Sequence, residues 1–336
     1  MSWRRRRWPD VRRNAPALTP VAPTVDPRPD DLVELTEGAA ISGTPIMMHA
    51  LSGFLDAGAA RHIAVAHLLE TLDHGTVATF DVDLLFDYRA RRPRMVFDTN
   101  RYDSVAMPEL LLSRLTDADG VPFLLLHGPE PDFGWQRVTR SVLGLVDRFD
   151  VRLTVGLNAI PWASPHTRPI GVTAHATSPD LIVGHRSWIG QVEVPGHLAG
   201  VLELALGKAG KPAMGYAVHV PHYLVSAEYP RAALRMLEEV SHSTGLSIPL
   251  EALRHKADEA DTALDAQVAE NAENVEAIAL LEAQYDALVG LPRGASGTSQ
   301  DGTTHEGGPL PSGDEIAAQL EQFLRDLDDG PADPPA

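Results

Sequence analysis

Two carboxylates, Glu130 and Asp132, stand in a Pro-rich loop (GPEPD) between a predicted strand at residues 121–127 and a predicted helix at residues 136–149. Paired carboxylates in such a place can hold a metal ion or act as general acid and base. The same residues can instead serve the helix, with Asp132 as its cap and Glu130 near its positive end. We favour this second interpretation, because a cap needs only the local sequence, whereas catalysis needs partners from elsewhere in the chain.

A second polar loop, SPHTRP, carries His166, Thr167 and Arg168 between prolines. An arginine beside an imidazole can bind an anion. Alternatively, the prolines stiffen the loop and Arg168 pairs with a carboxylate such as Glu130 or Asp132. We favour the ion pair, because charges inside large α/β proteins are usually paired.

The third polar loop, HVPHYL, follows the last predicted strand and carries His219, His222 and Tyr223. Two histidines three residues apart are weak evidence for zinc, and Pro221 prevents one helical face from presenting both. His175 would supply a third imidazole if its strand lay beside this one. We predict no metal site here.

The loop SGFLDAG precedes a predicted helix and contains Asp56. A helix N-terminus can receive a phosphate group. Because the Asp56 carboxylate would repel that group, we predict a cap or a tight turn instead.

Convergence of these loops on one cleft would make a small-molecule enzyme of hydrolase or phosphorylase type. Its candidate catalytic residues are Glu130, Asp132, His166, Arg168 and His222. The sequence has no Walker loop, dinucleotide fingerprint, GxSxG elbow or HExxH motif. The absence of cysteine excludes thiolate zinc sites, iron–sulfur clusters and a cysteine nucleophile. We therefore predict no cofactor, and we favour a protein that is not an enzyme.

The elements that must position these loops alternate between short apolar runs and amphipathic helical segments from residue 44 to residue 223. This alternation is typical of an α/β layered sheet, in which loops gather at the carboxyl ends of the strands. Strands are predicted at residues 45–51, 77–82, 95–97, 110–112, 121–127, 152–160, 170–174 and 213–220, and helices at residues 63–72, 136–149, 198–208 and 230–243.

Charge and composition divide the remainder of the 336-residue chain, whose net charge is -18 and whose hydrophobic content is 44%. Four basic and 19 acidic residues lie within residues 251–336, a net charge of −15. We expect a disordered basic leader at 1–40, an α/β core at 41–248, an acidic helical arm of the same domain at 249–290, a flexible linker at 291–312, a terminal helix at 313–328 and a disordered tail at 329–336. The apolar stripe of the arm suits packing against the domain or against a partner helix.

Several of these motifs, taken in order, resemble the bacterial branch of the proteasome assembly chaperone two family. They are GFLDAG, LTDADGVPFLLLHGPEPD, PHTRP with VTAHAT, and VPHYL with YPRAA. The resemblance implies a phosphorylase/hydrolase-like fold, a three-layer α/β/α sandwich, here with a C-terminal helical extension. It also implies self-association, with a trimer as one option, and ATP-independent assembly of proteasome rings in the eukaryotic and archaeal relatives.

The sequence departs from the family pattern at its end. Relatives that dock on the proteasome use a C-terminal hydrophobic–Tyr–any-residue tail, whereas this sequence ends in Asp-Pro-Pro-Ala. Some relatives are labelled as ligases of the ATP-grasp type, but no nucleotide signature here supports that activity. The partners that we expect are other copies of the chain and proteasome subunits or another protein.

The N-terminal segment MSWRRRRWPDVRR is basic, but no apolar segment of an export signal follows it. We therefore expect a cytoplasmic protein without membrane attachment. The acidic net charge argues against nucleic acid as a partner.

Overall fold

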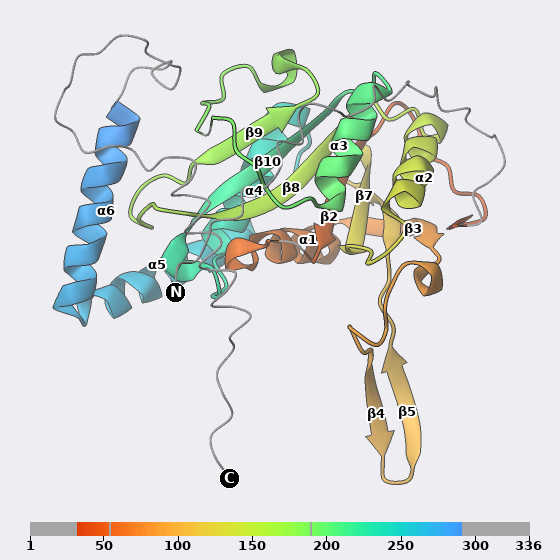
Figure 1. The fold of residues 1–336 in the computed structure, drawn as a ribbon, viewed down its shortest axis with the longest axis horizontal. Helices are drawn as coiled ribbons and strands as arrows, with labels where there is room; N and C mark the ends of the chain where they lie inside the picture. The colour runs from red at the N-terminus through yellow and green to blue at the C-terminus, as the bar shows by residue number, and fades with distance from the viewer. Residues whose placement is uncertain (1–31, 54, 189, 291–336) are drawn as a thin grey trace, which may run out of the picture. The chain divides into compact units, whose positions relative to one another are not determined.

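A computed structural model describes residues 32–53, 55–188 and 190–290 of the chain. Its centre is an eight-stranded sheet with the strand order β1-β3-β6-β7-β2-β8-β10-β9 (Figure 1). The strands are β1 (Val33–Leu35), β2 (Ile46–Ser52), β3 (Asp73–Phe80), β6 (Leu111–Thr116), β7 (Pro122–Pro129), β8 (Leu153–Trp162), β9 (Val172–Ala176) and β10 (Ala213–Pro221). Residues 32–40, expected within the disordered leader, instead include β1, which pairs with β3.

The four middle strands, β7, β2, β8 and β10, run parallel to one another. Their carboxyl ends therefore lie along one edge of the sheet, and the loops that follow them gather there. In the sheet, β7 lies on one side of β2 and β8 lies on the other, so the chain crosses over β2 between these two strands. This reversal places β2 at the switch point of the sheet, where α/β proteins commonly bind ligands.

Helices cover both faces of the sheet because successive strand residues point to opposite sides. On one face α1 (Ala60–Thr71), α4 (Pro230–Thr244) and α5 (Glu251–Ala269) pack over a core that includes Met48 and Ala50 of β2. On the other face α2 (Trp135–Arg148) and α3 (Leu198–Lys208) pack over a core that includes Met47 and Leu51. The predicted α/β/α sandwich is confirmed.

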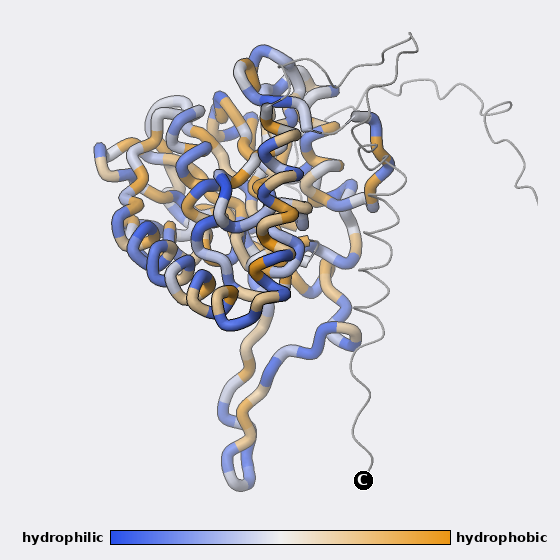
Figure 2. The backbone as a smooth tube through the Cα atoms, turned by 90° about the vertical axis from the view of Figure 1, so that its left-hand side faces the viewer, coloured by the Kyte–Doolittle hydropathy of each residue, from blue (hydrophilic) through white to orange (hydrophobic). Residues whose placement is uncertain are grey.

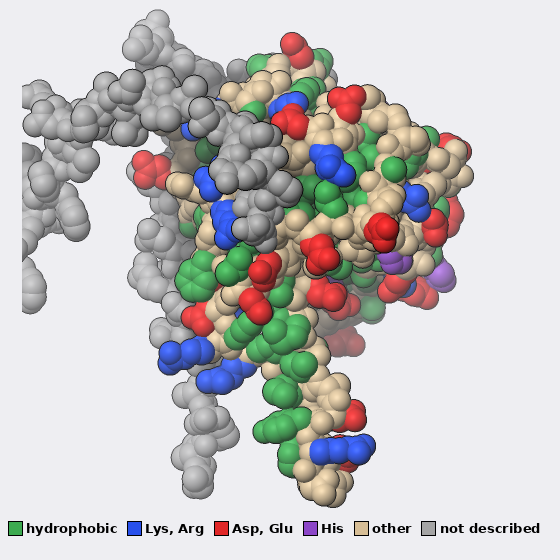
Figure 3. Space-filling view, turned by 90° about the vertical axis from the view of Figure 1, so that its right-hand side faces the viewer, with side chains coloured by type: hydrophobic (Ala, Val, Ile, Leu, Met, Phe, Trp, Pro, Cys, Tyr) green, Lys and Arg blue, Asp and Glu red, His purple; other side chains and the backbone are tan. Residues whose placement is uncertain are grey.

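A two-stranded hairpin, β4 (Arg94–Asp98) and β5 (Arg101–Ala106), projects from this sandwich (Figure 1). Only residues 95–97 were predicted as strand. Every residue of both strands is exposed, and both hydrophobic and hydrophilic stretches lie along the arm (Figure 2). The pairs Met95–Val105 and Phe97–Tyr102 face each other across the ladder, so four apolar side chains share one face. Figure 3 shows hydrophobic side chains following one another along this arm.

The C-terminal arm consists of two helices, α5 and α6 (Ala272–Gly290). The apolar spacing of the sequence predicted an uninterrupted helix in this region. The side chain of Asn271 accepts a hydrogen bond from the backbone N–H of Glu273 at 2.9 Å, and this cap starts the second helix. The predicted linker 291–312, terminal helix 313–328 and tail 329–336 lie outside the described residues. No helix in the described ranges is long and apolar enough to cross a membrane.

Candidate functional site

Asp132, in the loop after β7, binds the loop that precedes the hairpin. Its carboxylate accepts a hydrogen bond from the backbone N–H of Asp87 at 2.8 Å and forms an ion pair with Arg91. Desolvation opposes ionisation of Asp132, but the bonds from Arg91 and Asp87 prevail and lower its pKa. The residue that caps α2 is Gly134, without a side-chain cap. The interpretation of Asp132 as the cap of that helix is therefore wrong.

Glu130 lies at the positive end of a helix, but the helix is α3 rather than α2. Its carboxylate accepts a hydrogen bond from the backbone N–H of Leu198, the first residue of α3. The backbone N–H of Glu130 donates to the carbonyl of Ser52, at the end of β2. Glu130 thus joins three chain segments at the carboxyl edge of the sheet, a role that needs tertiary structure and that local sequence cannot reveal.

An open cavity of about 430 Å³ lies between the loops that follow β2 and β7. Its volume suits a small molecule. The indole N–H of Trp135 donates to the carbonyl of Pro131 at 2.6 Å and fixes one wall. The lining residues are Gly53, Arg91, Glu130, Pro131, Asp132 and Trp135.

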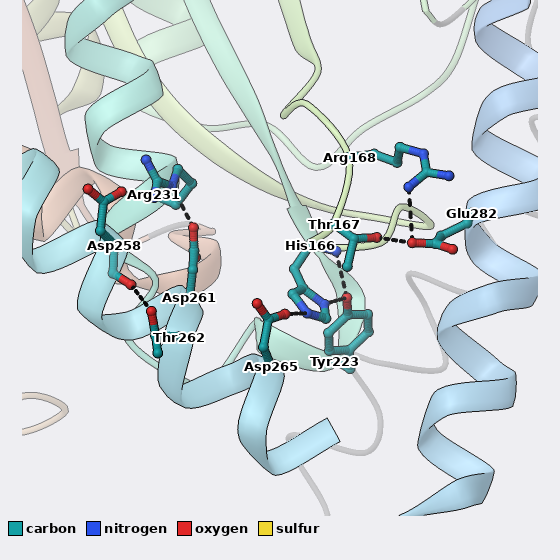
Figure 4. A network of polar contacts seen from close by, with 10 residues as sticks. All are labelled: His166, Thr167, Arg168, Tyr223, Arg231, Asp258, Asp261, Thr262, Asp265 and Glu282. Atoms are coloured by element: carbon teal, nitrogen blue, oxygen red, sulfur yellow. Dashed lines mark hydrogen bonds and ion pairs between the residues drawn. The ribbon is translucent and has the colours of Figure 1, made fainter. Parts of the chain in front are cut away.

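The loop after β8 makes its contacts elsewhere, with the C-terminal arm (Figure 4). His166 Nδ1 lies 2.7 Å from the hydroxyl oxygen of Tyr223, and its Nε2 lies 3.1 Å from Asp265 of α5. Burial raises the pKa of Tyr223 to about 12. The Tyr223 hydroxyl also accepts the backbone N–H of His166. These contacts connect the loops after β8 and β10 to the end of α5.

Arg168 and Thr167, next in the same loop, bind α6 (Figure 4). The Arg168 guanidinium donates to both carboxylate oxygens of Asp286 at 2.8 Å and to Glu282 at 3.0 Å. The Thr167 hydroxyl donates to the same Glu282 carboxylate. Hydrogen bonding to Asp286 raises the pKa of Arg168, and the same contact lowers the pKa of Asp286.

The partners of Arg168 correct the predicted pairing with Glu130 or Asp132. Its acids come from α6, more than a hundred residues further along the chain. Within the described ranges no hydrogen bond or ion pair joins the loop after β7 to the loop after β8. The proposed catalytic residues therefore fall into separate groups with different partners, and His222 lies beside Tyr223 at a ring separation of 5.4 Å.

The remaining histidines of the third loop also have separate partners. His219 is buried, stacks on Trp162 at 3.9 Å and lies 2.8 Å from the hydroxyl of Thr173. Burial lowers its pKa to about 3. His175 Nδ1 lies 2.7 Å from the carboxylate of Glu203 on α3. Among the residues that the structure describes, no three His, Asp, Glu or Cys side chains are placed to hold a metal ion.

Asp56 lies before α1, and its two oxygens accept the backbone N–H groups of Arg61 at 2.8 Å and His62 at 3.1 Å. The sequence pointed to this carboxylate but not to Arg61, which follows it on α1. It also missed Arg91, and it missed the acids of the arm because acidic residues on a helix are usually solvated. An arginine among the apolar positions at the start of a predicted helix was the signal available for Arg61.

The model of the PAC2 family matches residues 50–268, which include all of these loops. The chain belongs to the PAC2 family. The predicted family resemblance is thus confirmed, and the match covers the end of β2, all strands from β3 to β10, the helices α1 to α4 and nearly all of α5.

Solved structures of other PAC2-like proteins share the fold of this family member. A Mycobacterium tuberculosis protein of unknown function has 43% identity and a TM-score of 0.73, with 77% of this chain and 90% of that chain covered. A Corynebacterium glutamicum protein of unknown function has 39% identity and a TM-score of 0.74, over 77% and 98% of the two chains. A Mycobacterium tuberculosis proteasome-assembly chaperone homologue has 27% identity and a TM-score of 0.64, over 69% and 99%. No curated protein matches the chain.

Proposed function

We propose that this PAC2 family member is a protein-binding assembly factor that acts on proteasome subunits in the cytoplasm, without catalysis and without ATP. Family membership supports this proposal, as does the similarity to a Mycobacterium tuberculosis protein described as a proteasome-assembly chaperone homologue. Self-association belongs to the proposal too, with a trimer as one option.

The observation that carries a binding function is the apolar face of the β4–β5 hairpin. Met95, Phe97, Tyr102 and Val105 are 48 to 70% exposed. A two-stranded hairpin on its own is at best marginally stable in water, and an exposed apolar patch of this kind marks a protein contact. The hairpin is therefore the surface that we assign to protein partners.

The polar loops give less support to an enzyme. Asp132, Glu130 and Arg168 each hold a different part of the chain in place, through Arg91, α3 and α6 respectively. A catalytic acid, base or nucleophile must instead meet its partner groups at the reacting atoms. Glu130 and Asp132 line one cavity, but His166, Arg168 and His222 do not line it, so we do not propose hydrolase, phosphorylase or ligase activity.

Binding to purified proteasome subunits tests the proposal directly. We expect the full chain to retain these subunits in a pull-down, and the double variant Phe97→Ser, Tyr102→Ser to retain at least about tenfold less, because apolar anchors dominate protein interfaces. The matched control is Val183→Ser, which removes a hydrophobic side chain that is 80% exposed elsewhere on the surface. Failure of the unmodified chain to retain any proteasome subunit would overturn the proposal.

Light scattering on the same variants separates the two kinds of partner. If the hairpin variant falls from an oligomer to a 36.2 kDa monomer, the apolar face binds other copies of the chain. A monomeric unmodified protein at micromolar concentration would contradict self-association.

A further inference from the structure

The cavity of about 430 Å³ lies between the loops that follow β2 and β7, at the carboxyl edge of the sheet. Strand order reverses at β2, and ligands of α/β proteins commonly bind at such a switch point. Two side chains of opposite charge, Arg91 and Glu130, line this cavity. The hydrogen bonds that each of them makes within the protein leave some of its polar atoms without a partner.

Arg91 brings unused donors to the cavity. Its Nη2 donates to the carbonyl oxygen of Glu130 at 2.8 Å and to the carboxylate of Asp132. The guanidinium also lies over the ring of Phe86, 5.3 Å from the ring centroid. These contacts fix the side chain, whereas Nη1 has no hydrogen-bond partner in the described part of the chain. Both N–H donors of Nη1 are therefore available to a ligand.

Glu130 brings an unused acceptor. Its Oε1 accepts the backbone N–H of Leu198 at the start of α3, and this bond fixes the carboxylate. Its Oε2 has no hydrogen-bond partner among the residues that the structure describes. Asp132, the other acid of the cavity, uses both of its oxygens, one for Arg91 and one for the backbone N–H of Asp87. Glu130 is therefore the acid of this cavity that has an oxygen for a ligand.

Gly53 keeps the space between these two groups open. A Cβ atom at this position would lie 3.2 Å from Cβ of Glu130 and 3.8 Å from Nη1 of Arg91, so both residues border the same point of the cavity. The φ of Gly53 is 136°, a conformation that residues with a side chain rarely adopt. The backbone thus requires glycine here, and the absence of a side chain leaves room for a ligand to contact both charged residues.

Trp135 adds an apolar wall. Its indole N–H donates to the carbonyl of Pro131 at 2.6 Å. Because this bond uses the single donor of the indole, the ring offers only apolar contact to the cavity. An apolar group of a ligand would pack against it.

We propose that this cavity binds a free α-amino acid with an apolar side chain. Nη1 of Arg91 donates to its carboxylate, Oε2 of Glu130 accepts from its ammonium group, and its side chain packs against Trp135. A zwitterion matches both charges, whereas a simple amine meets the guanidinium and a simple carboxylate meets the acids of the cavity. This site is separate from the apolar face of the hairpin and does not depend on the proposed proteasome partner.

Three probes that share an isobutyl group test the assignment. They are L-leucine, isoamylamine, which lacks the carboxylate, and isocaproate, which lacks the ammonium group. Saturation-transfer NMR titrations of the full chain, near neutral pH and at fixed ionic strength, give the Kd of each probe. We expect L-leucine to bind saturably and about tenfold more tightly than either analogue, because each analogue loses hydrogen bonds between charged groups.

Two variants separate the two charges of the site. Glu130→Gln keeps an oxygen for the N–H of Leu198 but removes the charge that meets the ammonium group, so L-leucine and isocaproate should bind equally. Arg91→Met removes the donors to the carboxylate, so L-leucine and isoamylamine should bind equally. The control is Arg92→Met, which removes a neighbouring exposed arginine outside the cavity lining and should leave all three Kd values unchanged.

Three results would overturn the proposal. They are no saturable binding of L-leucine to the unmodified protein, binding of either analogue as tight as that of L-leucine, and a preference for L-leucine over isocaproate that persists in Glu130→Gln. Equal weakening of all three probes in both variants would show that these residues only hold the loops in place, and it would overturn the proposal too. Since none of these measurements uses a protein partner, their outcome is separate from that of the proteasome pull-down.

Discussion

Arg61 and Arg168 lie at the same edge of the sheet and differ in almost every physical respect. Arg168 is partly exposed and makes three hydrogen bonds to two carboxylates of α6. Arg61 is buried, and its ion pair with Asp56 is long at 4.0 Å. An exposed arginine with satisfied donors holds two segments together, whereas a buried arginine with a long ion pair is poorly compensated for the water that it has lost.

The same contrast extends to the surroundings of each arginine. The loop around Arg168 is one of several anchors of the arm (Figure 4), because Arg231 of α4 also binds Asp261 of α5 at 2.7 Å. The charged partner of Arg61 is Asp56, whose two oxygens accept backbone N–H groups of the first turn of α1. Loops after neighbouring strands thus serve different purposes, and fold alone does not say which.

The largest expected effect comes from removing the carboxylate beside the buried arginine. Asp56→Ala leaves Arg61 without its ion pair and two N–H groups of α1 without an acceptor, so we expect a loss of about 3 kcal/mol in the free energy of unfolding. Asp286→Ala, on exposed α6, should cost much less, because exposed ion pairs contribute little to stability. Urea unfolding of both variants measures the difference. Equal losses in the free energy of unfolding would contradict the contrast between the two arginines.

The pH dependence of stability distinguishes the two regions next. The pKa of His49 is 6.5 in the unfolded chain and about 3 in the folded protein. As pH falls below 6.5, the unfolded state takes up a proton that the folded state does not, so the free energy of unfolding decreases by about 1.4 kcal/mol per pH unit for this residue. Its contribution is present above pH 6.5 and is lost as pH falls toward 3. His219 behaves in the same way.

His49→Gln should therefore reduce the slope between pH 6 and pH 4 by about 1.4 kcal/mol per pH unit, measured by urea unfolding at each pH. The pKa of Asp286 is lowered from 3.8 by Arg168. Its stabilisation is present above 3.8 and is lost only below that value. Asp286→Asn should thus leave the slope above pH 4 unchanged. An unaltered slope in His49→Gln would show that His49 is not buried as described.

A smaller global effect is expected from the paired arginine itself. Arg168→Met should lower the free energy of unfolding only slightly, since exposed ion pairs contribute little. Local opening should change more, with amide exchange in α6 about tenfold faster, because this helix has few buried contacts of its own. Arg114→Met, at a pair 3.8 Å long with Asp73, is the control and should leave α6 exchange unchanged.

The smallest expected effect is that of salt. Raising sodium chloride to about 0.5 M should screen the exposed contacts of Arg168 and accelerate amide exchange in α6 about twofold. The buried contact between Arg61 and Asp56 should respond less, measured as the exchange rate of the first turn of α1. A larger response in α1 than in α6 would reverse the assignment of buried and exposed pairs.

The sequence alone determined the layers of this protein and its family. The alternation of apolar runs and amphipathic segments predicted the sandwich, and the helix expected at residues 198–208 is α3 with the same bounds. These patterns are local, since each reports the surroundings of a residue through its near neighbours in the chain. The second strand of the hairpin was missed because its turn has Thr99 at a φ of 54°, where a glycine would have signalled it.

Only the tertiary structure decided which charged groups meet. Glu130 binds α3 instead of α2, and Arg168 binds α6 instead of the acids after β7. These two contacts join residues 68 and 118 positions apart, which strand order and crossover bring together. Residue type determines what a side chain can bind, but the topology of the sheet determines what lies within its reach.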